Sequence, residues 1–160
     1  MEHYEGFHTL RGYQLLETNQ NYLTPAMEDY IEMIYRQCQE GGVVRVGLLA
    51  QALHVRMPSV SKMLQKLSEL ELISYQKYGM VSLTGEGKAI GKYLLRRHKE
   101  VERMLQNLGV EERLLMETER IEHQISPHTF RMIVKANAFL NIHPEILEDF
   151  SSFCRSESKT

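Results

Sequence analysis

The sequence predicts a mainly α-helical protein that has a winged helix-turn-helix near its N-terminus and a second helical unit behind it. Three observations lead to this fold class. Apolar residues recur at helical spacing over most of the chain after residue 22, a tight turn joins two short helices, and a small β-hairpin follows them. With 160 residues, 42% of them hydrophobic and 25% charged, the chain can form one compact unit or two small ones.

The first 22 residues have no sustained periodicity, and we treat them as an N-terminal arm of uncertain order. Regular structure is expected from Thr24 and Pro25, which form an N-cap followed by a proline at the first helical position. Apolar residues then recur at helical spacing until Gly41 and Gly42. The pattern predicts a helix between these two signals.

A helix-turn-helix is predicted next. A short helix covers about 47–53, a four-residue turn covers 54–57, and Pro58 opens a second helix. The second helix carries an apolar stripe of Val60, Met63, Leu64 and Leu67. Two short strands, 73–75 and 80–83, surround a turn that ends in glycine, as in the wing of a winged helix. The predicted domain spans residues 23–93.

Helices dominate the remainder of the chain. Thr84 caps a long helix that ends near Gly109, a second helix covers about 111–124, and Ser126 with Pro127 begins a third. His143 and Pro144 interrupt the pattern before a last short helical turn. We therefore predict a helical domain over 94–150 and a polar, fraying tail over 151–160.

Composition excludes several classes of protein. No apolar run approaches the roughly 20 residues that span a bilayer, and the N-terminus lacks the features of a secretion signal. Cys38 and Cys154 are far apart and form no CxxC pair, so reduced thiols are expected. We expect a cytoplasmic protein without a membrane partner.

The charge distribution predicts a polyanionic partner. Residues 45–99 hold ten Lys and Arg against three Glu, a net +7, whereas the rest of the chain sums to −9. The side of the second helix opposite its apolar stripe, together with the preceding turn and the wing, offers groups suited to DNA bases and phosphates. The predicted DNA-binding residues are Arg56, Pro58, Ser59, Ser61, Lys62, Gln65, Lys66, Lys77 and Tyr78.

Two other interpretations stay open for this basic segment: a merely solvated basic face, and a winged helix that contacts protein. If the segment binds DNA, one helix-turn-helix buries too little surface for tight and specific binding. We therefore expect a homodimer on two half-sites of double-stranded operator DNA.

Acidic and imidazole side chains on three helices predict a metal site. Glu119, Glu122 and His123 share an arc of about 100° on one helix, Asp29 and Glu32 are spaced i, i+3 on another, and His98 interrupts an apolar stripe. Each has an ordinary alternative, such as a solvated acid or a hydrogen-bonded core histidine. Together, the four carboxylates carry a charge of −4, which two divalent cations would neutralise. Oxygen and imidazole ligands without thiolate favour Mn²⁺ or Fe²⁺ over structural zinc.

Residues 23–141 resemble the manganese-responsive branch of the diphtheria toxin repressor family. The matching stretches are Thr-Pro-Ala-Met-Glu-Asp-Tyr-Ile-Glu (24–32), Pro-Ser-Val-Ser-Lys-Met-Leu-Gln-Lys-Leu (58–67), Leu-Thr-Gly-Glu-Gly-Lys (83–88), Arg-His (97–98) and Ile-Glu-His (121–123). The resemblance implies a homodimeric, metal-dependent repressor of metal uptake genes. It also implies a C-terminal domain that dimerises, and two ions per subunit held by Asp29, Glu32, His98, Glu119, Glu122 and His123.

The resemblance favours Mn²⁺ as the effector, because iron-responsive relatives tend to carry sulfur at the positions of Asp29 and Glu119. Glu32 and Glu122 are the implied bridging ligands. Gln124 departs from relatives that have a second histidine there, and we expect no third domain of the kind found in the iron branch. We expect Fe²⁺, Zn²⁺ or Cd²⁺ as possible substitutes, and no small organic ligand.

Three alternatives remain at this point. One is an iron- or zinc-responsive repressor of the same family, and another is a metal-free regulator whose acids are surface features. The most remote is a dinuclear metalloenzyme, since the only Glu-x-x-His match is Glu5 to His8 in the arm.

Overall fold

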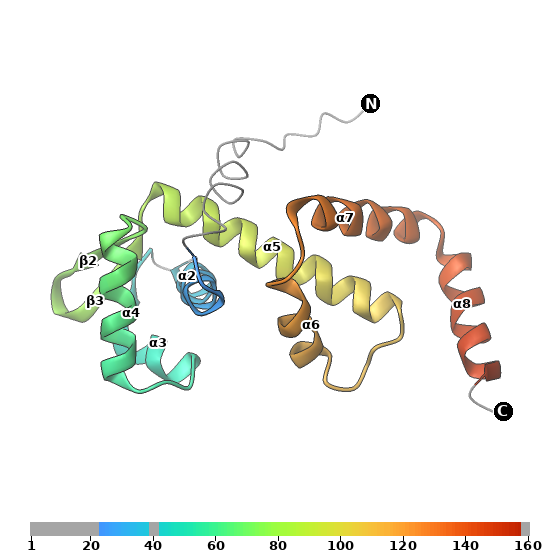
Figure 1. Ribbon diagram of the computed structural model, residues 1–160, viewed down its shortest axis with the longest axis horizontal. Coiled ribbons are helices and arrows are strands. Elements are labelled where there is room, and N and C mark those ends of the chain that lie inside the picture. The colour runs from blue at the N-terminus through green and yellow to red at the C-terminus, as the bar shows by residue number, and fades with distance from the viewer. Residues whose placement is uncertain (1–22, 39–41, 158–160) are drawn as a thin grey trace. The chain divides into compact units, whose positions relative to one another are not determined.

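The computed structural model describes residues 23–38 and 42–157. Their contacts divide the chain into two compact units, one ending at Leu95 and the other beginning at Arg96 (Figure 1). The expected N-terminal arm, residues 1–22, lies outside the described residues. None of the described helices is both long enough and apolar enough to cross a membrane.

The helices of the first unit confirm the predicted helix-turn-helix. Helix α2 covers Pro25–Cys38, and the Thr24 hydroxyl accepts a hydrogen bond from the Met27 amide at 3.4 Å, as expected of an N-cap. Helix α3 covers Val46–Ala52 and α4 covers Met57–Glu69. Between α3 and α4, His54 adopts a left-handed conformation with a φ of 52°, which reverses the chain in few residues.

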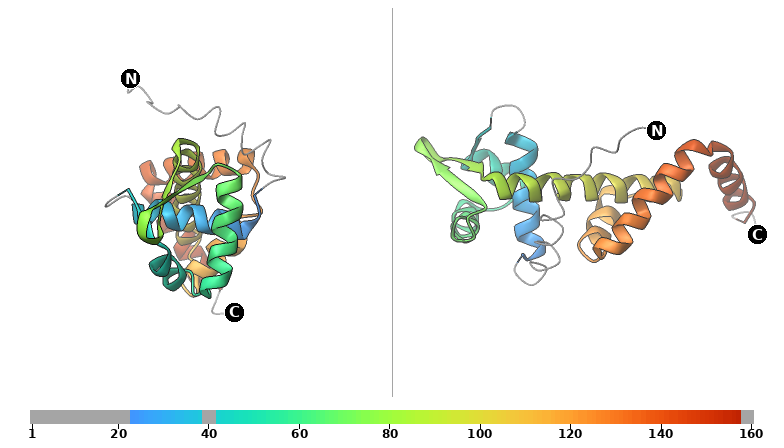
Figure 2. Two further views of the ribbon diagram at one scale, coloured as in Figure 1. Left: turned by 90° about the vertical axis from the view of Figure 1, so that its left-hand side faces the viewer. Right: turned by 90° about the horizontal axis from the view of Figure 1, so that it is seen from above.

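A three-stranded antiparallel sheet completes this unit, with strand order β1-β3-β2. Strands β2 (Ile73–Gln76) and β3 (Met80–Leu83) form the predicted hairpin, which projects from the helices of the unit in Figure 2. Strand β1 (Val44–Arg45) was not predicted, because two residues are too few to show alternation. Between β2 and β3, the 3₁₀ turn Lys77–Gly79 places Tyr78 as well as Gly79 at positive φ.

One hydrophobic core joins the helices and the sheet of the first unit. Its fully buried members include Ile31, Ile34, Leu49, Val60, Leu64, Leu67, Val81 and Leu94. Helix α5 (Gly85–Asn107) begins in this unit, where the Thr84 hydroxyl accepts a hydrogen bond from the Gly87 amide at 3.1 Å. A Cβ added at Gly91 would lie 2.6 Å from the Cβ of Tyr35, so glycine allows α5 and α2 to approach closely.

The second unit holds the rest of α5 with α6 (Leu114–Glu122), α7 (Pro127–Ile142) and α8 (Pro144–Glu157). The Ser126 hydroxyl caps α7 by accepting from the Thr129 amide at 3.1 Å, as predicted. Helix α6 is shorter than the predicted 111–124, because Arg113 at its N-cap has a left-handed φ of 55°.

The prediction of a short last turn and a fraying tail was wrong for residues 144–157, which form the 14-residue helix α8. Pro144 supplies a favourable first helical position, and Ile146, Phe150 and Phe153 recur at helical spacing. The segment is polar on average because of the residues between them, so its composition does not reveal the apolar stripe.

A buried amide links α5 and α7 in the second unit. The Asn137 Nδ2 donates to the Glu100 backbone carbonyl and to the Glu100 carboxylate, both at 2.8 Å. Its Oδ1 accepts from Asn107 Nδ2 at 3.2 Å. Because Asn137 is only 1% exposed, these bonds satisfy an amide that would otherwise be costly to bury.

Candidate metal centre and nucleic-acid interface

A buried imidazole and a buried carboxylate form the centre of the candidate metal site in the second unit. His98 lies on α5 and Glu122 is the last residue of α6. The His98 Nδ1 is 3.1 Å from one Glu122 carboxylate oxygen and 3.3 Å from the other, and the residues are 5% and 2% exposed. An imidazole that carries its ring proton on Nδ1 donates a hydrogen bond to the Glu122 carboxylate at these distances.

His123 lies beside this pair and contacts an arginine. Its Nε2 is 3.9 Å from a Glu122 carboxylate oxygen, and its Nδ1 is 3.3 Å from the Nη2 of Arg97. Arg97 directly precedes His98 on α5 and is 5% exposed. Three of the six predicted ligands, His98, Glu122 and His123, therefore lie together in one unit.

The other predicted ligands occupy two helices. Glu119 lies one turn before Glu122 on α6 and is exposed. Asp29 and Glu32 lie on α2 in the first unit, three residues apart, which places them on one side of that helix. Within the first unit Glu32 forms an ion pair with Arg36, one turn along α2.

The donor set of the second unit fits a divalent cation. It combines a carboxylate with two imidazoles, and a cation would replace the hydrogen between His98 and Glu122 while neutralising a buried negative charge.

Neither described cysteine forms a disulfide, as predicted. Burial raises the pKa of the Cys38 thiol, and a backbone hydrogen bond at Leu83 and the Lys88 ammonium offset this only in part, so the thiolate that binds metals is disfavoured.

Helix α4 presents the predicted polar face to solvent. Val60, Leu64 and Leu67 are fully buried and Met63 is partly buried, which confirms the predicted apolar stripe. All the predicted DNA-binding residues of this helix and of the preceding turn are exposed: Arg56, Pro58, Ser59, Ser61, Lys62, Gln65 and Lys66. Gln65 also contacts the Glu69 carboxylate, at 3.2 Å, from the same exposed side.

The tip of the wing carries the last two predicted DNA-binding residues. Lys77 is exposed, and Tyr78 is 96% exposed. A tyrosine held at a positive φ with its ring in water has no packing role in this unit. The ring is therefore accessible to another molecule.

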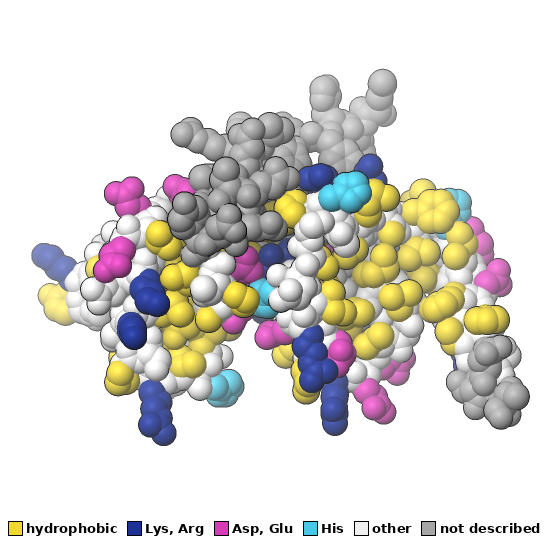
Figure 3. All heavy atoms as spheres, in the orientation of Figure 1, with side chains coloured by type: hydrophobic (Ala, Val, Ile, Leu, Met, Phe, Trp, Pro, Cys, Tyr) yellow, Lys and Arg dark blue, Asp and Glu magenta, His cyan; other side chains and the backbone are white. Residues whose placement is uncertain are grey.

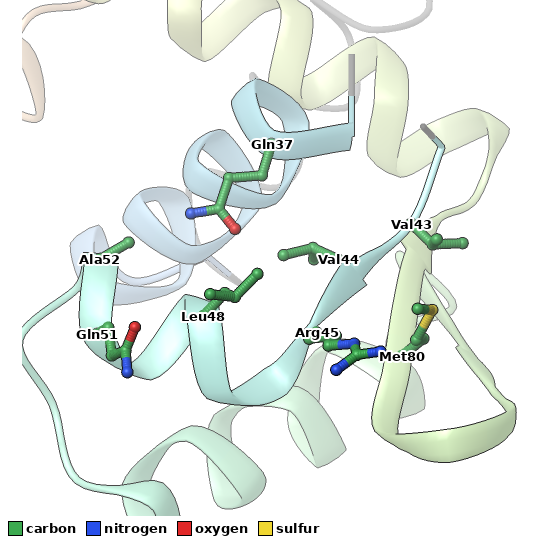
Figure 4. A pocket seen from close by; sticks show the side chains of 8 residues that line it. All are labelled: Gln37, Val43, Val44, Arg45, Leu48, Gln51, Ala52 and Met80. Atoms are coloured by element: carbon green, nitrogen blue, oxygen red, sulfur yellow. The ribbon is translucent and has the colours of Figure 1, made fainter. Parts of the chain in front are cut away.

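Sequence reasoning missed a pocket in the first unit (Figure 4). It is formed by the end of α2, by β1, by α3 and by Met80 of β3, and the Gln37 Oε1 is buried beside it. None of the predicted site residues line it. Periodicity carries no signal for this pocket, because its lining residues come from α2, β1, α3 and β3, and their meeting depends on how these elements pack.

The second unit also exposes large apolar side chains. Figure 3 shows hydrophobic side chains gathered over α7 and α8. The exposed members on these helices are Met132, Phe139, Ile142, Ile146, Phe150 and Phe153. Contiguous apolar surface of this kind is typical of a protein interface.

Comparison with known proteins identifies the family from both units. Residues 22–81 match the iron dependent repressor N-terminal DNA binding domain, and residues 84–151 match the iron dependent repressor metal binding and dimerisation domain. The chain belongs to the iron-dependent repressor family. The sequence-based prediction of a metal-dependent transcriptional repressor is confirmed, and the metalloenzyme alternative is excluded because members of this family are regulators.

Individual relatives agree with this membership. The chain is 48% identical over 104 residues to the HTH-type transcriptional regulator MntR of Bacillus subtilis strain 168, a match that covers 64% of this chain and 73% of the relative. Among solved structures, it is similar to the manganese regulator SloR (TM-score 0.64, 29% identity) and to the metal-dependent transcriptional regulator MtsR (TM-score 0.66, 28% identity). These matches cover 74% and 73% of this chain, and the chain spans 55% of the length of each of the two structures.

Proposed function

We propose that this protein is a manganese-responsive repressor, which binds operator DNA as a homodimer when each subunit holds two divalent ions. The buried His98–Glu122 pair, with His123 beside it, is the observation that carries this proposal. The names of the relatives support manganese, since MntR of Bacillus subtilis is 48% identical over 104 residues and SloR is titled a manganese regulator.

The proposed ligands come from both units. His98, Glu119, Glu122 and His123 belong to the second unit, whereas Asp29 and Glu32 lie on α2 of the DNA-binding unit. An ion held by both groups would link the two units. We propose that this restricts the separation of the two recognition helices α4 in the dimer towards about 34 Å, one turn of DNA.

The metal ion then acts as the effector, because it binds the DNA-competent conformation of the dimer more tightly than the other conformations. Such coupling is typically worth about 1 to 3 kcal/mol, and it is reciprocal, so operator DNA should tighten metal binding by the same factor. The exposed face of α4 would read base edges and phosphates in the major groove, while Lys77 and Tyr78 of the wing contact the backbone or the minor groove.

The apolar surface over α7 and α8 supports the homodimer. A two-fold axis would bring the same surface of two subunits together, which removes these side chains from water. We also propose that the dimer is located in the cytoplasm, together with the operator DNA that it binds.

Fluorescence anisotropy on DNA tests the proposal. A duplex is first selected from a random pool by the Mn²⁺-loaded protein, and the metal-free protein is then titrated at fixed salt with Mn²⁺, anaerobic Fe²⁺, Zn²⁺ and Mg²⁺. We expect strong activation by Mn²⁺ and little by Mg²⁺. Activation by Fe²⁺ or Zn²⁺ in preference to Mn²⁺ would instead identify the iron- or zinc-responsive alternative.

A matched pair of variants connects this response to the site. Glu122→Gln keeps the shape of the side chain but removes the buried charge, so it should abolish activation by Mn²⁺. Glu148→Gln makes the same change at an exposed position of α8 and should leave activation intact. DNA binding by Glu122→Gln that equals the wild type, with or without metal, would favour the metal-free regulator.

A further inference from the structure

We propose that Arg97 is a displaceable lock on the metal site, whose hydrogen bond to His123 must break before His123 can bind an ion. The inference rests on the proposed function, because it requires His123 to be a metal ligand. It concerns a residue that supplies no ligand itself, since a guanidinium has donors and no acceptor.

The argument begins with the hydrogen bond from Arg97 Nη2 to His123 Nδ1, at 3.3 Å. Because arginine is always protonated and donates only, the Nδ1 of His123 must supply the lone pair. A neutral imidazole has only one unprotonated nitrogen, so the ring proton is on Nε2. That nitrogen faces the Glu122 carboxylate, 3.9 Å from its nearer oxygen.

Metal coordination needs the same lone pair. An ion can bind Nδ1 only after Arg97 has left it. Binding at Nε2 requires the proton to move to Nδ1, where it would meet the donor of Arg97. Only an imidazolate could accept from Arg97 and bind a metal together, so in a neutral ring the two interactions exclude each other.

Burial makes this competition effective. The side chain of His123 is 12% exposed and Arg97 is 5% exposed, so water cannot readily replace the hydrogen bond. A hydrogen bond from a charged donor is stronger than one between neutral groups, particularly away from water. The free energy of metal binding at His123 must therefore exceed the free energy lost when the hydrogen bond from Arg97 breaks.

The lock also predicts selectivity. Mn²⁺, Fe²⁺ and Zn²⁺ accept imidazole nitrogen and can compete with the guanidinium for it. Mg²⁺ prefers oxygen ligands and keeps its water, so it gains little at His123 and leaves Arg97 in place. Arg97 thereby helps the site reject an ion with the same charge as Mn²⁺.

Metal affinity of three variants tests the lock, measured by isothermal titration with Mn²⁺ in competition with a chelator. Arg97→Met removes the donor at similar length, and we expect Mn²⁺ to bind about tenfold more tightly, equivalent to about 1.4 kcal/mol. Arg96→Met makes the same change at the adjacent, exposed arginine and should bind like the wild type. Arg97→Lys keeps the charge, and its ammonium can still donate a hydrogen bond. Where nitrogen NMR shows that His123 Nδ1 has lost its hydrogen bond in this variant, we expect tighter Mn²⁺ binding; unchanged binding in that case would assign the effect to charge alone and refute the lock.

His123→Ala separates the two proposals. If it binds Mn²⁺ as tightly as the wild type, the ligand assignment of His123 fails and the lock fails with it. If it binds at least tenfold more weakly but Arg97→Met is no tighter than Arg96→Met, the ligand assignment stands and only the lock fails.

Nitrogen NMR of the metal-free wild-type protein tests the lock without any variant of Arg97. The imidazole signals that disappear in His123→Ala belong to His123. We expect a protonated Nε2 and an unprotonated, hydrogen-bonded Nδ1. A proton on Nδ1 in the metal-free protein would overturn the proposal, because Arg97 then could not donate to that nitrogen.

Discussion

The wing lysine offers a direct measure of how this repressor holds DNA. Lys77 lies at the tip of the hairpin, is exposed, and precedes a tyrosine that is 96% exposed. Substituting Lys77→Gln removes one positive charge and keeps a flexible polar side chain, so the turn should retain its shape. If the wing touches the DNA backbone, each subunit loses one phosphate contact.

The magnitude follows from counterion release. In a homodimer the substitution removes two phosphate contacts, and each contributes about 0.9 to the slope of log affinity against log salt concentration. The slope should therefore become less steep by about 1.8. Between 0.05 and 0.2 M salt, the wild-type affinity should fall about 12-fold further than that of the variant.

Anisotropy with the Mn²⁺-loaded protein, repeated across that salt range, measures the slope. Arg155→Gln is the control matched in charge, since Arg155 is exposed on α8 in the other unit, on the side of that helix away from Ile146 and Phe150. Its slope should equal that of the wild type. A Lys77→Gln slope that is unchanged would refute a phosphate contact by the wing.

The remaining predictions concern packing and thiol chemistry. Asn137→Ala should lower the free energy of unfolding by about 2 kcal/mol, measured in urea by circular dichroism, because polar groups on α5 lose a buried partner. Asn141→Ala changes an exposed asparagine and should alter this free energy by less than about 0.5 kcal/mol. Equal effects of the two substitutions would contradict a stabilising role of the Asn137 hydrogen bonds. Gly91→Ala should cost about 1 to 3 kcal/mol in the same assay, since the new methyl group would collide with α2, and a neutral result would show that the helices separate freely. Burial raises the pKa of Cys38 and so reduces its thiolate fraction at pH 8. Its alkylation should therefore begin at a higher pH in the folded protein than in the urea-unfolded chain. Mass spectrometry should find the exposed Cys154 modified first, and faster labelling of Cys38 would contradict the prediction.

Local signals in the sequence determined most of the secondary structure. The caps at Thr24, Thr84 and Ser126 act over three residues, so the identity of the residue and its neighbours is enough to place them. The stripe of Val60, Leu64 and Leu67 likewise follows from helical periodicity, which is why the exposed face of α4 was predictable. Strand β1 and the length of α8 were not, since a two-residue strand and a stripe diluted by polar residues leave weak periodic signals.

The family resemblance grouped the proposed ligands, but only the tertiary structure decided which polar atoms contact one another. Sequence spacing placed Glu122 and His123 on one helix, but the contact of Glu122 with His98, 24 residues earlier, depends on how α6 folds back against α5. The bond between Arg97 and His123 depends on the same packing. Helical periodicity fixes the face on which a residue lies, whereas a partner on another helix is fixed by chain reversal and by burial, which local sequence does not encode.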